Sequence, residues 1–188
     1  MSETFEIRKR NAERTRETIL AAAQDVFSTT PYGEASLKEI TRRAGANPAL
    51  VSRYFGSKEK LFEEALAAAL DAGMLTAAPR ERFGEAIAEL FTTPSGSRIN
   101  PLPMLIFAAA NKETQAIAVA LLHEKVMQPL ETWIGGDDAA ARAAEIMAVS
   151  TGFFTFQLIL PLRPFQGRID KSVRHWLADS LQEIIDRA

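Results

Sequence analysis

Apolar residues recur at helical spacing along almost the whole chain, and nowhere does the period-two alternation of a half-buried strand persist. The first clear stripe lies on one face of a helix expected over residues 11–28. It consists of Ile19, Ala22, Ala23, Val26 and Phe27. Threonine, proline and glycine break the pattern at residues 29–33. The pattern predicts an all-α protein of about nine helices.

Residues 36–54 have the spacing of two short helices joined by a tight turn. Ser36 and Glu39 form a capping-box pattern, in which the Ser36 hydroxyl accepts from the amide of residue 39 and Glu39 reaches back to the amide of Ser36. Gly45 in the turn suits a left-handed cap, and Asn47 before a proline suits the start of the second helix. The pattern therefore predicts a helix-turn-helix.

Proline, glycine and capping residues divide the rest of the chain into further helices. Ser57 is expected to cap a helix over residues 58–75, and Asp170 is expected to cap the last helix. Pro129 falls within a helix expected over residues 112–133, where it predicts a kink or an early stop. The remaining helices are expected over residues 82–91, 101–111 and 138–160.

In a helix-turn-helix the second helix is held across the first, so that its N-terminal face can enter a DNA major groove. Lys38, Tyr54 and Lys58 lie where they could touch phosphates, and the free amides that follow Ser57 could also bind one. The apolar residues expected to lock the pair in place are Leu37, Ile40, Leu50 and Val51. Side chains expected to be exposed on the second helix are Asn47, Pro48, Ala49, Ser52 and Arg53.

Charge is distributed unevenly along the chain. Residues 1–60 carry a net charge of +3 and residues 61–188 a net charge of −5, although the whole chain carries only −2. The basic end includes the cluster Arg8, Lys9 and Arg10. This asymmetry favours a polyanion as the partner of the first third of the chain, although a solvated basic face would give the same pattern.

Composition excludes several classes of chemistry. The chain has no cysteine, so disulfides, thiolate catalysis and cysteine-type metal sites are excluded. Its two histidines form no H-E-x-x-H motif, and the phosphate-binding and nucleophile-elbow motifs of enzymes are missing, so no enzyme activity, metal or cofactor is expected. The longest uncharged run, residues 146–162, has 17 residues and falls short of the roughly 20 that a membrane span needs. With no signal-peptide core at the N-terminus, a cytoplasmic protein is expected.

Two segments carry a family resemblance: T-R-E-T-I-L-A-A-A-Q-D-V-F, and then S-L-K-E-I-T-R-R-A-G-A-N-P-A-L-V-S-R-Y-F-G-S-K-E-K-L-F. Over about residues 12–66 they resemble the N-terminal domain of the TetR family of transcriptional regulators. The remainder matches that family only in length and helical organisation. The resemblance implies a DNA-binding domain over residues 1–60 and a helical ligand-binding and dimerisation domain over residues 61–188. Its most specific parts are Ala44-Gly45, Tyr54-Phe55 and Ser57-Lys58-Glu59-x-Leu61-Phe62.

The resemblance also assigns roles to single residues. Lys38 matches a position that reaches a base edge, and Tyr54 and Lys58 match positions that grip phosphates. The basic cluster at residues 8–10 would form an arm along the minor groove or the backbone. The DNA-binding set implied by the resemblance is Ser36, Lys38, Asn47, Pro48, Ala49, Ser52, Arg53, Tyr54 and Lys58.

Three positions depart from the family pattern. Tyr32-Gly33 stands where the family usually has glycine before the aromatic residue, which leaves the packing of that ring open. Thr41 replaces a common small alanine. Ser52 replaces a frequent tyrosine, so the base-reading surface is expected to be small.

The last two expected helices are apolar on more than one side and should be buried on more than one side. They could pair with their copies in a second subunit as a four-helix bundle, which the resemblance also implies. A two-fold dimer would set two reading helices about 34–36 Å apart, to match a palindrome. Alternatively, these stripes face only the chain's own core. The residues expected at the dimer interface are Ile146, Val149, Phe153, Phe156, Leu160, Val173, Trp176, Leu177, Leu181 and Ile184.

Helices between residues 82 and 160 would enclose the remaining space as a mostly apolar pocket with a few polar groups. Its phenylalanine-rich walls favour a small apolar or aromatic effector. Each apolar candidate also suits plain core packing, and Asn111 also suits a helix cap. The candidate ligand-binding residues are Phe107, Asn111, His123, Met127, Phe153 and Gln157, with Phe83, Met104 and Trp133 as further candidates for the lining.

These features favour a homodimeric DNA-binding repressor that a small apolar ligand releases from a palindromic operator. A second hypothesis keeps the DNA-binding dimer, but its C-terminal domain serves only dimerisation or protein docking and takes no small-molecule effector. A helical enzyme is a distant third hypothesis.

Overall fold

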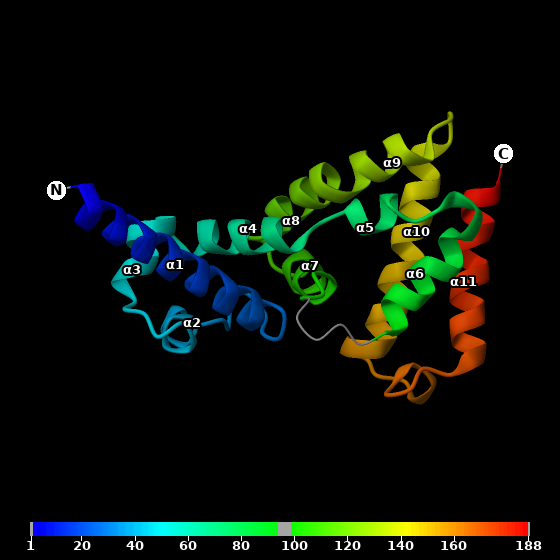
Figure 1. Cartoon of the computed structure of the whole chain (residues 1–188). Helices are drawn as coiled ribbons and strands as arrows, with labels where there is room; N and C mark the ends of the chain where they lie inside the picture. The colour runs from blue at the N-terminus through cyan, green and yellow to red at the C-terminus, as the bar shows by residue number, and fades with distance from the viewer. Residues whose placement is uncertain (1, 94–98, 188) are drawn as a thin grey trace. The chain divides into compact units, whose positions relative to one another are not determined.

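The computed structural model describes residues 2–93 and 99–187, with side chains from residue 10 onward, and these ranges contain helices and turns but no strand. The prediction of an all-α protein is confirmed. The chain divides into two compact units, which Figure 1 shows with all their helices. Unit 1 comprises residues 1–69 and 99–120, and unit 2 comprises residues 70–98 and 121–188. The predicted helix-turn-helix lies entirely within unit 1.

Unit 1 is built around a long first helix. Its α-helices are α1 (Ser2–Phe27), α2 (Leu37–Arg43), α3 (Ala49–Phe55), α4 (Lys58–Ala69), α7 (Leu102–Ala109) and most of α8 (Gln115–Leu122). The predicted stripe of α1 is buried, and α1 packs against α2 and α4. The helix starts at Ser2 rather than at residue 11, because no proline or glycine interrupts the helix-favouring residues before Pro31.

The Tyr32 ring, whose packing the sequence left open because Tyr32-Gly33 departs from the family pattern, packs in the core of this unit. Its ring lies 6.1 Å from that of Phe27 and 5.5 Å from that of Phe62, centroid to centroid. Only 6% of Tyr32 is exposed. The glycine that follows lies beside Asn111, whose amide nitrogen would be 3.8 Å from a Cβ at residue 33. The aromatic ring therefore fills the core despite the departure from the family pattern.

Asn111 lies at the start of the turn that precedes α8 and is not the cap of that helix, which begins at Gln115. Its side-chain oxygen accepts from the amide of Glu113 at 2.9 Å, and its carbonyl accepts from the amides of Thr114 and Gln115. Thr114 is fully buried and donates to the carbonyl of Ala108 at 3.3 Å. The turn between α7 and α8 is thus held by its own hydrogen bonds.

Unit 2 is a helical bundle whose longest helices, α10 and α11, have 16 residues each. Its elements are α5 (Gly73–Thr76), a 3₁₀ turn (Arg80–Arg82), α6 (Phe83–Thr92), α9 (Gln128–Ile134), α10 (Ala139–Phe154), a second 3₁₀ turn (Arg163–Phe165) and α11 (Lys171–Asp186). The helix expected over residues 58–75 instead ends at Ala69, and a short break separates α4 from α5. The predicted cap on α11 is confirmed, because the Asp170 carboxylate accepts from the amide of Ser172 at 2.8 Å.

The packing of α6 against α11, with α10 beside them, forms the core of unit 2. Gly84 of α6 makes the closest approach, and its amide donates to the side chain of Gln182 at 2.9 Å. Arg142 of α10 is buried and donates to the carbonyls of Ile184 and Ile185 at 2.9 and 2.7 Å, which satisfies the C-terminal end of α11. Side chains of this core include Phe83, Ile87, Leu130, Ile146, Phe153, Leu177 and Leu181.

Two helices contain wider, π-helical turns. One spans His123–Met127 and directly precedes α9, which continues through Pro129 to Ile134. Pro129 therefore does not stop the helix early, and a widened turn precedes it. The other spans Thr155–Ile159 at the end of α10, just before Pro161. Because proline has no amide hydrogen, a widened turn before it lets the chain continue without an i to i−4 bond at that point. Within residues 2–93 and 99–187, no helix is both long and apolar enough to cross a membrane.

Candidate nucleic-acid interface

The turn between α2 and α3 is closed by backbone hydrogen bonds around a left-handed glycine. The amide of Ala44 donates to the carbonyl of Ile40 at 3.0 Å, and the amide of Ala46 donates to that of Thr41 at 2.8 Å. Gly45 has φ of +62°, a conformation that favours glycine because it has no Cβ. The predicted left-handed cap is confirmed, and it sets the direction in which α3 leaves α2.

Two of the three predicted caps in this region are confirmed. The Asn47 side-chain oxygen accepts from the amide of Ala49 at 2.9 Å and so starts α3. The Ser57 hydroxyl accepts from the amide of Lys60 at 3.1 Å and starts α4. These bonds fix the first turns of the helix expected to read DNA and of the helix that follows it.

The capping box predicted at Ser36 is wrong. The Ser36 side chain makes no capping hydrogen bond. Glu39 instead bonds to Arg42 and Arg43, with nitrogen–oxygen distances of 2.8 Å to each. A carboxylate forms stronger hydrogen bonds with a guanidinium than with a neutral amide. Glu39 therefore binds the two arginines and not the Ser36 amide.

Buried side chains hold the helix pair against α1 and α4. Ile40, Val51 and Phe55 have at most 6% of their surface exposed. Leu37 and Leu50, which were expected to lock the pair as well, are only half-buried. Thr41 is buried too, and its hydroxyl donates to the carbonyl of Leu37 at 2.9 Å, which explains how this position tolerates a polar residue in place of alanine.

The opposite side of the pair is exposed. The predicted DNA-binding residues that are exposed are Ser36, Lys38, Asn47, Pro48, Ala49, Ser52 and Arg53. They come from the start of α2, the turn, and the first half of α3. The structure thus brings the expected base-reading side chains together on the solvent side of one short segment, and their contact with DNA remains a prediction.

Tyr54 and Lys58 occupy a different environment, since both are half-buried. The guanidinium of Arg53 lies 5.9 Å from the centre of the Tyr54 ring. The Lys58 ammonium donates to the Tyr32 carbonyl at 2.6 Å and lies 4.3 Å from the centre of the Tyr32 ring. Burial lowers the pKa of Lys58, an effect that the charge of Glu113 opposes. One of the three ammonium hydrogens is thus used within the unit, which leaves two for a phosphate.

α1 carries further basic residues. Arg16 forms an ion pair with Glu64 and lies 4.9 Å from the centre of the Phe55 ring, so it ties α1 to α3 and α4. Arg10 is exposed. The side chains of Arg8 and Lys9, which were expected to form an arm with Arg10, lie outside the described residues. The backbone at all three positions is part of α1.

The Glu39 carboxylate partly neutralises the positive charge of Arg42 and Arg43 on α2. Hydrogen bonds from Arg42 and then Arg43 lower the pKa of its carboxyl from 4.5 to about 2. Because the folded-state pKa lies below the ordinary value, these ion pairs are intact at neutral pH and are lost only as the pH falls below about 4.5 toward 2. Glu39 therefore remains charged, and neutralises part of the arginine charge, throughout the physiological range.

Replacing Glu39 by glutamine is expected to raise non-specific DNA affinity about three- to tenfold at low salt, because two arginines next to the exposed face lose their counter-charge. The measurement is anisotropy titration with an unrelated duplex between pH 5 and 8, where the difference should not vary with pH. Glu89→Gln, which makes the same charge change on α6, is the control. Equal affinities for wild type and Glu39→Gln would contradict the prediction.

The candidate ligand-binding residues are divided between the two units. Phe107 and Asn111 belong to unit 1, whereas the other four belong to unit 2. His123 is exposed, while Phe153 is fully buried and its ring packs against those of Phe91, Phe154 and Phe165. Their role in binding a ligand remains a prediction.

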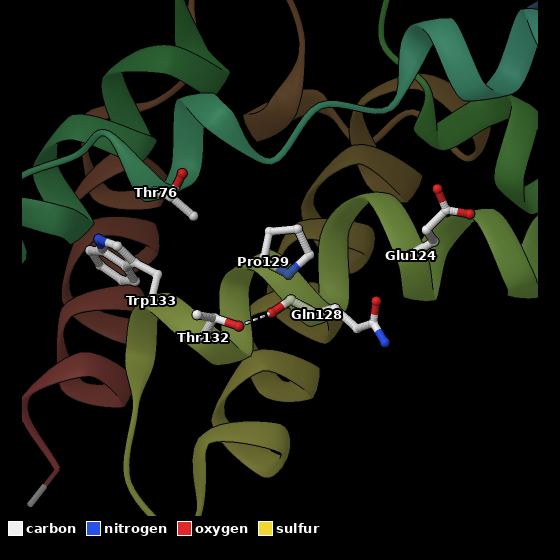
Figure 2. A pocket seen from close by; sticks show the side chains of 6 residues that line it. All are labelled: Thr76, Glu124, Gln128, Pro129, Thr132 and Trp133. Atoms are coloured by element: carbon white, nitrogen blue, oxygen red, sulfur yellow. Dashed lines mark hydrogen bonds between the residues drawn. The ribbon is translucent and has the colours of Figure 1, made fainter.

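A groove that the sequence did not indicate lies in unit 2 (Figure 2). Only Trp133 among its residues was expected to line a pocket. Pro129 inside a helix was the one signal for a distortion here, and Thr76 comes from a distant part of the sequence. The groove is lined by Thr76, Glu124, Gln128, Pro129, Thr132 and Trp133.

The residues expected at a dimer interface fall into two groups. Val149 and Val173 are half-buried, and Phe156, Leu160 and Trp176 are 40, 60 and 47% exposed. The other five lie in the chain's own core and have at most 7% of their surface exposed. They agree with the alternative interpretation, in which these stripes face only the chain's own core. They are Ile146, Phe153, Leu177, Leu181 and Ile184.

Two family models match the chain. Residues 19–65 match the model described as bacterial regulatory proteins of the tetR family, and residues 81–185 match the tetracyclin repressor-like C-terminal domain. The second match alone covers more than half of the chain. Together the two models span both the helix-turn-helix and the helices of unit 2.

Individual proteins give similar results. The HTH-type transcriptional repressor NicS of Pseudomonas putida is 43% identical over 56 residues, which are 30% of this chain and 26% of NicS. A solved TetR-family regulator from Streptomyces coelicolor A3 has a TM-score of 0.55 at 23% identity, over 93% of this chain and 96% of the other. A transcriptional regulator from Rhodococcus sp. Rha1 has a TM-score of 0.63 at 19% identity, over 90% and 93%. These two structures share the fold of this chain.

Proposed function

Because the chain belongs to the TetR family of bacterial regulatory proteins, and is therefore a transcriptional regulator and not an enzyme, we propose that it is a homodimeric repressor. The repressor binds a palindromic operator in the cytoplasm and is released by a small apolar or aromatic effector. The observation that supports this proposal is the exposure of seven of the nine predicted DNA-binding residues within the segment from Ser36 to Arg53, which holds α2, the turn and most of α3.

DNA binding follows from how α3 is presented. Its apolar residues Val51 and Phe55 are buried against the unit, which leaves Ala49, Ser52 and Arg53 exposed. Small side chains at the start of α3 let the backbone approach the bases closely, and Arg53 supplies donors for a guanine edge or a phosphate. Lys38 and Lys58 add phosphate contacts on either side, so the affinity is expected to be strongly salt-dependent.

The test is a fluorescence-anisotropy titration with the DNA upstream of the protein's own gene, repeated at several salt concentrations with an unrelated duplex as control. A dimer that contacts about six phosphates should give a slope of about −5 for log K against log salt. Preference for the upstream DNA supports a specific regulator. Failure to bind any duplex in a salt-sensitive manner contradicts the proposal.

Dimerisation is expected through the exposed apolar side chains near the end of α10 and on α11. Leu160→Glu places a charge on a residue that is 60% exposed in the single chain, so unfolding free energy should change by less than about 0.5 kcal/mol while the dimer dissociates. Sedimentation measures the oligomeric state. The control is Val119→Glu, which is 62% exposed on α8 and should leave the dimer intact. A dimer that survives Leu160→Glu would place the interface elsewhere.

One observation favours the hypothesis without an effector. The fully buried Phe153 is surrounded by three other phenylalanine rings, so the core around it is already filled by the chain itself. If unit 2 served dimerisation alone, no small molecule would release the operator. Screening apolar and aromatic compounds for release of the labelled DNA separates the two hypotheses.

A further inference from the structure

The groove in unit 2 is large enough for a small molecule. It is a shallow hollow of about 560 Å³ that is widely open to solvent. Ligand sites typically have roughly 300–1,000 Å³. Figure 2 shows its walls, with Thr76 on α5 facing Pro129 and Trp133 on α9, and Glu124 and Gln128 farther along. All six residues lie within one unit, so the site does not depend on how the two units are arranged.

The apolar wall of the groove is held rigidly. The guanidinium of Arg80 lies 5.0 Å from the centre of the Trp133 ring and donates to the carbonyls of Trp133 and Ile134 at 2.7 and 2.9 Å. The Phe83 ring lies 5.2 Å from the Trp133 ring. Arg80 is therefore occupied in positioning Trp133, and a ligand meets an indole whose orientation is already fixed.

Both hydroxyl groups of the groove have used their hydrogens within their own helices. Thr132 donates to the carbonyl of Gln128 at 2.8 Å, as Figure 2 shows, and Thr76 donates to that of Ala72 at 3.2 Å. A hydroxyl that donates in this way still carries lone pairs. Towards a ligand, both oxygens can act as acceptors.

The π-helical turn adds a backbone acceptor. The amide of Gln128 would bond to the carbonyl of Glu124 in a regular α-helix, but it donates to that of His123 instead. The next residue, Pro129, has no amide hydrogen. The Glu124 carbonyl therefore accepts neither from residue 128, as in an α-helix, nor from residue 129, as in a π-helix. It lies at the turn that carries the groove residues Glu124, Gln128 and Pro129.

The Glu124 carboxylate supplies negative charge. Its Oε1 atom accepts from the ammonium of Lys125 at 2.7 Å. The Glu124 side chain is largely exposed and that of Lys125 is partly exposed, and such surface pairs contribute little free energy. The carboxylate can therefore accept from a ligand as well. The lining combines an apolar wall with acceptors and the Glu124 carboxylate, which is paired with Lys125, while the Arg80 charge is held behind the wall by the Trp133 and Ile134 carbonyls.

We propose that this groove binds an organic cation, a protonated amine carried on an apolar ring. The ring packs against Pro129 and Trp133, and the ammonium donates to the Glu124 carboxylate and the neighbouring oxygens. For an anion the groove offers as donors only the uncharged Gln128 amide and the Trp133 indole N–H, and no cationic side chain is among its six lining residues. The binding of such a cation does not depend on the proposed function. Its role as the effector that releases DNA does rest on that function.

Binding is tested without DNA, using phenethylamine as the probe and 2-phenylethanol and phenylacetate as its neutral and anionic counterparts. Trp176→Phe leaves Trp133 as the sole tryptophan, so its fluorescence reports on the groove. Phenethylamine should give a saturable change that is at least threefold tighter than that of 2-phenylethanol, and phenylacetate should give none. Calorimetry on the wild-type protein checks the same order.

Two substitutions test the assigned acceptors. Glu124→Gln and Thr132→Val, both at exposed positions, should each weaken phenethylamine binding about two- to fivefold, whereas Glu89→Gln on α6 should not. The site is overturned by a Trp133 signal that does not saturate up to about 20 mM amine. Equal affinity for amine and alcohol, or no effect of either substitution, overturns the choice of a cation. Binding without release of operator DNA overturns only its role as effector.

Discussion

Gly84→Ala is expected to destabilise unit 2 by at least about 3 kcal/mol, because a methyl group at this position has no room. A Cβ there would overlap the Ala178 carbonyl oxygen and lie 2.9 Å from both the Ala178 carbonyl carbon and the Gln182 amide nitrogen. These are backbone atoms of α11, which cannot move aside as a flexible side chain would. α6 and α11 would have to separate, and the core residues Phe83 and Leu181 would lose contacts.

Thermal unfolding followed by circular dichroism measures this effect, and the midpoint should fall by roughly 6–12 °C. The matched control is Gly152→Ala on α10, where no atom of the described residues lies within 4 Å of the added Cβ. There the better helix propensity of alanine should raise stability by up to about 1 kcal/mol. A Gly84→Ala protein with the wild-type midpoint would mean that the two helices do not pack this closely.

Hydrophobic spacing predicted which helix faces are buried but not what buries them. The stripe of α1 was correctly assigned to the core because one chain offered α2 and α4 to cover it. The stripes of α10 and α11 were assigned to a partner subunit, yet Ile146 and Leu181 are fully covered by the chain itself. Periodicity specifies a face of a helix, and the identity of its partner depends on tertiary contacts that the pattern does not contain.

Local polar motifs were predictable where only one partner is available. Asn47 and Ser57 have no competing charged neighbour at the right spacing, and both cap their helices as expected. Ser36 and Glu39 also have the spacing of a cap, but Arg42 and Arg43 lie three and four residues after Glu39 and bind its carboxylate. The outcome depended on the relative strengths of two interactions that the same sequence allows.

The groove was outside the reach of sequence reasoning for a different reason. Pro129 predicted a kink or an early stop, whereas the structure has a π-helical turn before the proline and a helix that continues to Ile134. The groove also needs Thr76 from α5 and an indole fixed by Arg80, which lies 53 residues from Trp133 in the sequence. No local pattern connects these positions, so only the folded chain reveals the site.

Arg53→Ala is expected to weaken operator binding roughly 30- to 150-fold. Arg53 is the one exposed basic residue on α3, the helix proposed to enter the major groove. Loss of an arginine contact to a base or phosphate costs about 1–1.5 kcal/mol at the low end of the usual range, and a homodimer loses the contact twice. The resulting change of about 2–3 kcal/mol corresponds to the expected fold-change.

Titrations over several salt concentrations, with the operator and an unrelated duplex, distinguish the two kinds of contact. If Arg53 reads a base, its loss weakens operator binding more than binding to the unrelated duplex; if it grips a phosphate, both weaken alike and the salt slope falls by about two per dimer. The control is Arg82→Ala, which removes the same charge from unit 2 and should change affinity less than about twofold. Equal effects of Arg53→Ala and Arg82→Ala would mean that α3 does not enter the major groove of the DNA.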